Sequence, residues 1–199
     1  MSHELILASS SPRRRDLLSS LGLQFHVVPA ELQEIPAPHE AARNFAVRVA
    51  EHKALVVGTT YPHAWVIGAD TIVVVDGEIL GKPLDRADAK RMLQQLADRE
   101  HLVLTGYVLL NMAAEKKLKG VEETQVKINT LEQQEIEWYI NTNEPFDKAG
   151  AYAIQGKGAF MVDWIKGSYT NVVGLPLCQL IRLFKEAGVA GIFYSKALE

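Results

Sequence analysis

The chain has 199 residues, of which 48% are hydrophobic and 23% are charged, and its formal net charge at pH 7 is −3. This composition predicts an ordinary soluble, enzyme-sized unit that buries one sizeable core, or two lobes around a cleft, without disulfides or structural metal ions. The negative net charge excludes the basic field on which stable binding of long nucleic acids depends. No charged leader precedes an apolar segment and no apolar run approaches membrane-spanning length, which predicts a cytoplasmic protein without a membrane partner.

The first predicted strand, residues 5–7, leads into Ser9-Ser10-Ser11-Pro12-Arg13-Arg14-Arg15. Ser11 fits the N-cap of a following helix, and Pro12 fits its first position, where no backbone donor is needed. The free N–H groups of a helix start and the planar guanidinium groups both suit a phosphate. A basic helix start that is merely solvated is the alternative interpretation.

The next segment contains the candidate cation Lys53. A short strand is predicted at residues 25–28, a loop rich in acid and proline at 31–38, and a helix at 39–57. Apolar residues recur in that helix at a roughly helical period. This pattern places Lys53 in the last turns of the helix.

The most apolar stretch, residues 65–75, is interrupted by one carboxylate, Asp70. Burial of an unpaired carboxylate is costly, so we expect a cation, a metal or several donors beside Asp70, or a cleft that admits water. Gly68 and Ala69 are expected to leave space for a ligand. The alternative is that Asp70 only ends one strand and caps the next element.

Asp76-Gly77 predicts a tight hairpin turn that leads back through residues 78–80 and returns Lys82 toward Asp70. An ordinary exposed lysine is the competing interpretation of Lys82. The following elements are expected to be scaffold: a helix at 86–96, strands at 101–112 and 121–129, a solvated charged hairpin tip at 114–120, and a helix at 131–139.

The segment from residue 143 to 159 is rich in small residues, so its backbone can approach a ligand closely. Within it, the Gln155 amide offers both an acceptor and donors, which complement the imide edge of uracil or thymine. A glutamine that simply occupies a turn is the alternative. Residues 167–176 repeat the arrangement of strand, polar loop and helix start, either as a second wall of a cleft or as a plain helix entry. Cys178, the single cysteine, is expected to be a packed core thiol.

Five segments in this order resemble the Maf family of nucleoside triphosphate pyrophosphatases, and the resemblance extends from residue 5 to about residue 185. The segments are residues 8–14, 68–71, 81–83, 147–156 and 167–176. Ser10 is a minor departure, because many relatives carry glycine there. The resemblance implies an α/β fold with an elongated mixed sheet, helices outside it and two lobes around a deep cleft, similar to inosine triphosphate pyrophosphatases. Residues 1–199 are then one Maf-like domain, and a homodimer is compatible with the family.

The implied reaction is hydrolysis of a nucleoside triphosphate between its α and β phosphates, which yields a monophosphate and pyrophosphate in a house-cleaning role. The family's divalent cation would be Mg²⁺ or Mn²⁺. By this resemblance Asp70 is the proton acceptor or a metal ligand, and Glu34 is the second base or metal candidate. The remaining catalytic and phosphate-binding side chains are implied to be Lys53, Lys82, Ser9 and Arg14.

Subgroups of the family differ in the residues that face the base. Here these are Arg13, Thr71 and Gln155, which resembles the subgroup that acts on dTTP and UTP, in some members with modified pyrimidines. A 7-methyl-GTP subgroup, the first alternative, has tryptophan and glutamate in place of Arg13 and Gln155, because a methylated guanine is positively charged. The second alternative is a non-catalytic nucleotide sensor that regulates septum formation and cell division.

Overall fold

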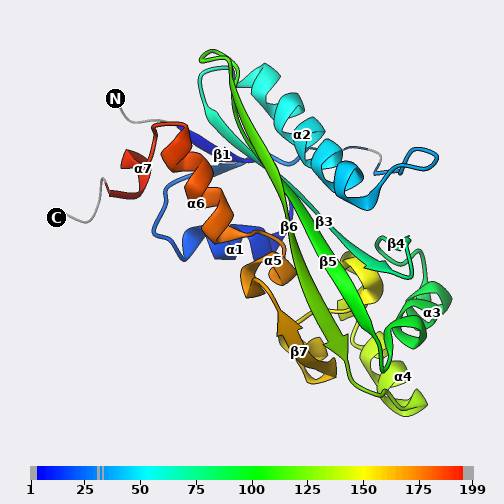
Figure 1. Ribbon diagram of the computed structural model, residues 1–199. Coiled ribbons are helices and arrows are strands. Elements are labelled where there is room, and N and C mark those ends of the chain that lie inside the picture. Colours follow the sequence, from blue (N-terminus) through cyan, green and yellow to red (C-terminus); the bar gives the residue numbers. More distant parts are fainter. Residues whose placement is uncertain (1–3, 31, 33, 195–199) are drawn as a thin grey trace. The chain divides into compact units, whose positions relative to one another are not determined.

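The computed structural model describes residues 4–30, 32 and 34–194 (Figure 1). Glu31 and Gln33, in the predicted loop at 31–38, therefore lie outside the described residues. The chain divides into two compact units. The first comprises Met1–Asp70, Thr105–Glu122 and Gly174–Glu199, and the second comprises Thr71–Leu104 and Glu123–Val173. The expectation of a single domain with a cleft between two lobes stays a prediction.

The seven strands of the described residues form one sheet in the order β2-β1-β3-β5-β6-β7, with β4 paired to β3. The sheet is mixed, because β1 is parallel to both β2 and β3 whereas β4 is antiparallel to β3. This result confirms the predicted α/β class with helices flanking a mixed sheet. The elements are β1 (Leu5–Leu7), α1 (Pro12–Ser19), β2 (His26–Val27), α2 (Ala42–Thr60), β3 (Trp65–Val75), β4 (Glu78–Leu80), α3 (Arg86–Leu96), β5 (Glu100–Asn111), β6 (Lys116–Ile128), α4 (Gln133–Asn141), η1 (Glu144–Asp147), η2 (Ala149–Ala151), η3 (Gly156–Met161), β7 (Val162–Lys166), α5 (Tyr169–Val173), α6 (Leu177–Glu186) and α7 (Gly191–Tyr194).

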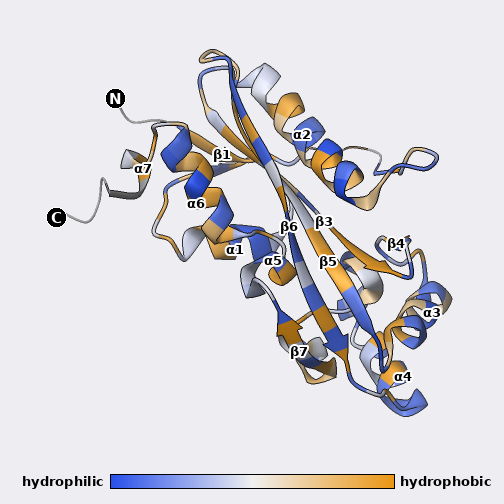
Figure 2. Cartoon of the chain, in the orientation of Figure 1, coloured by the Kyte–Doolittle hydropathy of each residue, from blue (hydrophilic) through white to orange (hydrophobic). Residues whose placement is uncertain are grey.

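In the first unit the sheet has a hydrophobic core on each face, because successive strand residues point to opposite sides. Leu5 and Leu7 of β1 pack with α1 and α6, whereas Ile6 between them packs with α2. The helices accordingly carry both hydrophobic and hydrophilic residues (Figure 2). Two glycines allow α2 to approach the sheet closely. A Cβ at Gly68 of β3 or at Gly106 of β5 would overlap a backbone carbonyl of α2.

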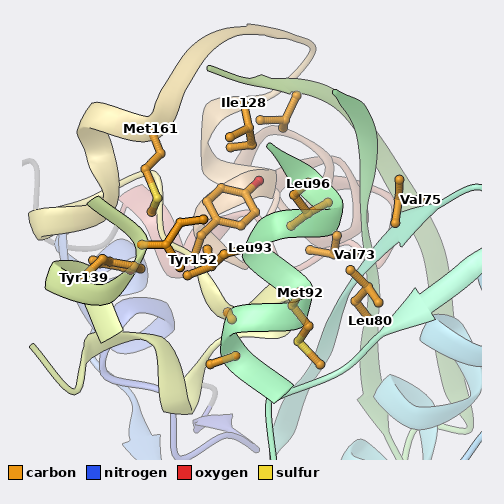
Figure 3. Packing of buried hydrophobic residues seen from close by; sticks show 14 of the residues in the cluster. Val73, Val75, Leu80, Met92, Leu93, Leu96, Ile128, Tyr139, Tyr152 and Met161 are labelled. Carbon is orange, nitrogen blue, oxygen red and sulfur yellow. The ribbon is translucent and has the colours of Figure 1, made fainter. Parts of the chain in front are cut away.

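The second unit has its own core, formed by α3 and α4 with the ends of the strands and with the segment from η2 to η3 (Figure 3). Val73, Leu93 and Tyr152 are examples of side chains that pack there. The hairpin between β3 and β4 turns at Asp76 and Gly77, both with positive φ (50° and 80°), as the sequence predicted. The helix predicted at 86–96 is also confirmed.

Two of the differences from the predicted element boundaries concern charged residues. Helix α2 starts at Ala42 and continues to Thr60, so Lys53 lies about two turns before its end rather than in its last turns. Strand β6 starts at Lys116, so the hairpin tip is shorter than the predicted 114–120, although most of these residues are exposed as predicted. Lys117 and Lys119 point to the same side of that strand and both bind Glu51 of α2, at Nζ–Oε distances of 2.6 and 2.7 Å.

Candidate active site

The turn between β1 and α1 forms as the sequence predicted. Pro12 occupies the first turn of the helix, and the Ser11 hydroxyl accepts a hydrogen bond from the Arg14 backbone N–H at 3.5 Å. The Arg14 side chain, however, is buried rather than solvated. Its Nε donates to the Gly174 carbonyl at 2.7 Å, and its Nη1 donates to the Ser9 hydroxyl at 3.1 Å. The buried Arg14 guanidinium group therefore stabilises this turn through hydrogen bonds. The interpretation of a merely solvated helix start does not apply to Arg14.

Three predicted site residues meet around the Lys53 ammonium group. Its Nζ lies 2.8 Å from an Asp70 carboxylate oxygen and 2.6 Å from a Glu34 carboxylate oxygen. The Lys53 and Asp70 side chains are only 8% and 5% exposed, whereas that of Glu34 is 37% exposed. Lys53 takes this position because α2 packs its buried alanines on the sheet beside β3. Of the kinds of partner expected for Asp70, the structure therefore shows a cation, the Lys53 ammonium group.

Electrostatic coupling joins Arg14 to this group. Burial raises the pKa of Asp70 above its usual range; Lys53 opposes this effect, Glu34 adds to it and Arg14 opposes it. Burial likewise lowers the pKa of Arg14, against the attraction of Asp70 and Glu34. We call Arg14, Glu34, Lys53 and Asp70 the charged cluster. Burial that raises the pKa of a carboxylate is one way in which enzymes prepare it to act as a general base.

The charged cluster also fits a divalent cation that binds together with a triphosphate. Among residues 4–30, 32 and 34–194, no group of three or more His, Cys, Asp and Glu side chains could hold a metal ion. Asp70 and Glu34 nevertheless provide two carboxylates beside one ammonium group. Mg²⁺ is commonly held by one or two carboxylates, with phosphate oxygens and water as its other ligands. Asp70 and Glu34 therefore suit a divalent cation whose other ligands are phosphate oxygens and water.

Two predicted residues of the second unit, Lys82 and Gln155, lie in two connected turns. Lys82 follows β4 and is exposed, and Gln155, just before η3, is also exposed. The Gly150 N–H donates to the Gly81 carbonyl at 3.0 Å, which ties the segment before Gln155 to the turn that carries Lys82. Thr71 of β3 is half-buried, as is Arg13 at the start of α1 in the first unit. The roles of these four side chains stay predictions.

Two sequence interpretations are corrected. Gly68 does not leave space for a ligand, because its missing side chain admits the backbone of α2 at Ala50, and Ala69 is fully buried in the core. Cys178 is exposed rather than a packed core thiol. It lies two residues before the buried Leu180 in α6, on another side of that helix.

Sequence reasoning missed a support for the loop that carries Glu34. Arg48 of α2 binds Glu40 through two hydrogen bonds of 2.7 Å, and its Nη2 also donates to the Ile35 carbonyl at 3.1 Å. The loop is thereby attached to the helix that carries Lys53. The spacing of Glu40 and Arg48 is visible in the sequence, but the bond from Arg48 to the Ile35 carbonyl has no side-chain signature.

Comparison with known proteins gives a consistent result. The family described as Maf-like protein matches residues 4–187. A dTTP/UTP pyrophosphatase of Geobacter metallireducens is 49% identical over 184 residues, which cover 92% of this chain and 96% of that protein. One of Clostridioides difficile is 44% identical over 190 residues, which cover 96% and 98%. The solved Staphylococcus aureus Ham1 protein has a TM-score of 0.52 at 14% identity, covers 93% of this chain and 99% of its own, and supports the fold alone.

Among the helices of the described residues, none has the length and apolar character needed to cross a membrane.

Proposed function

This chain belongs to the Maf family, and we propose that it hydrolyses dTTP and UTP to the nucleoside monophosphate and pyrophosphate. The observation that carries this proposal is the charged cluster, in which the nearly buried Lys53 bridges the nearly buried Asp70 and the more exposed Glu34. The two relatives described above, at 49% and 44% identity, are named dTTP/UTP pyrophosphatases and support the same substrate class.

In the proposed reaction, a water oxygen attacks the α-phosphorus and the bond from that phosphorus to the bridging oxygen breaks, so that pyrophosphate leaves. Asp70 accepts the proton of the attacking water, a role for which its raised pKa prepares it. The ammonium group of Lys53 and the guanidinium group of Arg14 bind phosphate oxygens, and the Ser9 hydroxyl, which Arg14 holds in place, donates to another. Lys82 is proposed to add a further cation at the phosphates.

Mg²⁺ or Mn²⁺ held by Asp70 and Glu34 would neutralise phosphate charge and polarise the phosphoryl group. The identity of the divalent cation as Mg²⁺ or Mn²⁺, a homodimer and a cytoplasmic location all stay predictions.

Base selection is proposed to rest on Arg13, Thr71 and Gln155. The Gln155 amide is exposed and can pair its donor and acceptor with the carbonyl and imide N–H of uracil or thymine. The fixed positive charge of Arg13 disfavours a cationic base such as 7-methylguanine. These two properties favour pyrimidine triphosphates over the 7-methyl-GTP alternative.

The decisive experiment measures pyrophosphate release from dTTP, UTP, CTP, GTP, ATP, ITP and 7-methyl-GTP with Mg²⁺ or Mn²⁺. Selective cleavage of dTTP and UTP is expected. Selective cleavage of 7-methyl-GTP would move the chain to the other enzyme subgroup, and nucleotide binding without turnover would favour the sensor. Asp70→Asn should lower turnover at least about 100-fold, whereas the control Asp76→Asn, at an exposed hairpin turn, should not.

Gln155→Glu tests the base-reading role separately from the chemistry. An ionised carboxylate cannot donate to a base carbonyl, so kcat/KM should fall for dTTP and UTP more than for the other nucleotides. Gln94→Glu, an exposed position on α3, makes the same charge change elsewhere in the second unit. Equal losses for all nucleotides in Gln155→Glu would remove Gln155 from base selection.

A further inference from the structure

The backbone that follows Gln155 is held by one carboxylate, that of Glu144. One oxygen of this group accepts a hydrogen bond from the Lys157 N–H at 3.0 Å. The other accepts from the Gly158 N–H at 3.0 Å and from the Tyr139 hydroxyl at 3.0 Å. Glu144 begins η1, thirteen residues before Lys157, so this contact fastens two separate turns of the second unit to each other.

Glu144 is held in its charged form by these contacts. Burial by itself raises the pKa of its carboxyl group, but the two backbone N–H groups, the Tyr139 hydroxyl and the Lys148 ammonium outweigh that effect and lower the pKa overall. Lys148 also donates to the Glu144 carbonyl at 2.6 Å. Hydrogen bonds to an ionised acceptor are roughly twice as strong as those between neutral groups. The attachment of the segment after Gln155 is therefore a strong one.

Gly156 shows how closely the backbone lies against Glu144. Its φ of +68° is a left-handed conformation that glycine adopts readily. A Cβ at this position would lie 2.8 Å from one Glu144 carboxylate oxygen and 3.2 Å from its carboxyl carbon. The residue directly after Gln155 therefore combines a special conformation with direct contact to the carboxylate.

A second attachment lies just before Gln155. The Tyr152 hydroxyl is 2.7 Å from Nε2 of His101 on β5, and the two rings meet edge to face with centroids 5.3 Å apart. Both side chains are buried, and Tyr152 lies in the core of the second unit (Figure 3). Between Tyr152 and Lys157 lie only residues 153–156, and Gln155 is the exposed polar side chain among them.

We propose that Glu144 is a positioning residue for base selection, which acts by fixing the backbone that presents the Gln155 amide. This inference rests on the proposed pyrimidine triphosphate activity and adds the residue that sets its selectivity. An amide can distinguish bases only if its donor and acceptor are both within hydrogen-bond reach of the base edge. A misplacement of about 1 Å can cost about 100-fold in rate. Glu144 limits that misplacement without contact to the base.

The test compares kcat/KM for dTTP with kcat/KM for CTP in the wild type and in Glu144→Gln. Their ratio does not depend on the fraction of folded enzyme, so a merely structural role would leave it unchanged. We expect the ratio to fall at least about tenfold in Glu144→Gln, mainly through a higher KM for dTTP.

A double variant shows whether Glu144 acts through Gln155. In the background of Gln155→Ala, the change Glu144→Gln should have no further effect on the ratio, because the side chain that it positions is gone. Independent effects of the two changes would overturn the proposal, and so would a wild-type ratio in Glu144→Gln. If Glu144→Gln is too unstable to purify, Gly156→Ala replaces it under the same criteria.

The proposed substrate preference and the positioning role of Glu144 are contradicted by different results. A wild-type enzyme that shows no preference for dTTP over CTP overturns the proposed function before any variant is measured. A wild-type preference that survives in Glu144→Gln overturns the positioning role alone. The control Glu137→Gln, at an exposed ion pair with Lys90 on the neighbouring helix, should leave the ratio unchanged.

Discussion

Replacement of Lys53 by methionine tests whether the charged cluster is held together as the structure indicates. Methionine is unbranched, like lysine, and can fill the space of the Lys53 side chain, but it cannot form an ion pair with Asp70 or Glu34. The variant therefore leaves the Asp70 carboxylate, whose side chain is 5% exposed, without its hydrogen-bonded cation. Removal of one partner from a buried ion pair typically costs about 3–5 kcal/mol of unfolding free energy.

Two features of the cluster place the expected loss near the lower limit. Arg14 still attracts Asp70, and Glu34, at 37% side-chain exposure, can turn to water. We expect Lys53→Met to lose about 3 kcal/mol, which corresponds to roughly 6–12 °C in Tm for a chain of this size. Asp70→Asn should lower the unfolding free energy by a smaller amount, because Lys53 retains its ion pair with Glu34. In the double variant the two effects should not add, with a coupling energy of about 2 kcal/mol.

The pH dependence of this loss has a defined sign. A carboxyl group whose folded pKa is raised contributes stability that is present at acid pH and is lost as the pH rises through the folded pKa. Without Lys53 the pKa of Asp70 rises further, so the deficit of Lys53→Met should be smaller at pH 4.5 than at pH 7. Urea unfolding of the four proteins, followed by circular dichroism at both pH values, measures this directly. Additive effects with a deficit that does not change with pH would refute the reasoning.

Three further predictions address supports around the site. Burial lowers the pKa of His101 from 6.5 to about 4, so its contribution to stability is present above pH 6.5 and is lost toward pH 4. In urea unfolding between these two pH values, the wild type should lose roughly 3 kcal/mol more unfolding free energy than His101→Gln. Gly68→Ala would force α2 away from the sheet and should cost about 3 kcal/mol by calorimetry, whereas Gly81→Ala, which meets open space, should cost little. Glu40→Gln weakens the attachment of the loop that carries Glu34 and should lower kcat/KM about tenfold at a nearly unchanged Tm, and an unaltered kcat/KM would remove that loop from the mechanism.

The parts of the fold that sequence predicted well are those set by neighbouring residues. Ser11 and Pro12 determine a helix start, and Asp76 with Gly77 determines a hairpin, through conformations that depend on a few residues only. The need for a partner beside Asp70 was also predictable, because the cost of a buried carboxylate does not depend on the fold. The identity of that partner was not predicted, because the resemblance named Lys53 only as a phosphate-binding side chain and the structure shows its contact with Asp70.

Other features depend on long-range packing and have no local signature. The hydrogen bond from Arg14 to the carbonyl of Gly174 joins residues 160 positions apart and uses a backbone acceptor, which any residue type would provide. Gly68 was mistaken for a ligand-facing residue because a glycine is required equally by a nearby ligand and by a nearby helix backbone. The exposure of Cys178, in contrast, was predictable from the sequence. The helical spacing from the buried Leu180, Leu183 and Phe184 places Cys178 on another side of α6.

The charge balance of the cluster explains how such a site can be buried and still act on a polyanion. Arg14 and Lys53 offset Asp70 and Glu34, so the four groups together carry no net charge when all are ionised, and each buried charge has an opposite charge in the cluster. A triphosphate adds several negative charges and competes with both carboxylates for the two cations. The carboxylates released from Lys53 are then available to a proton or to a divalent cation. In the proposed reaction, substrate binding and activation of the base are therefore linked through one ammonium group, that of Lys53.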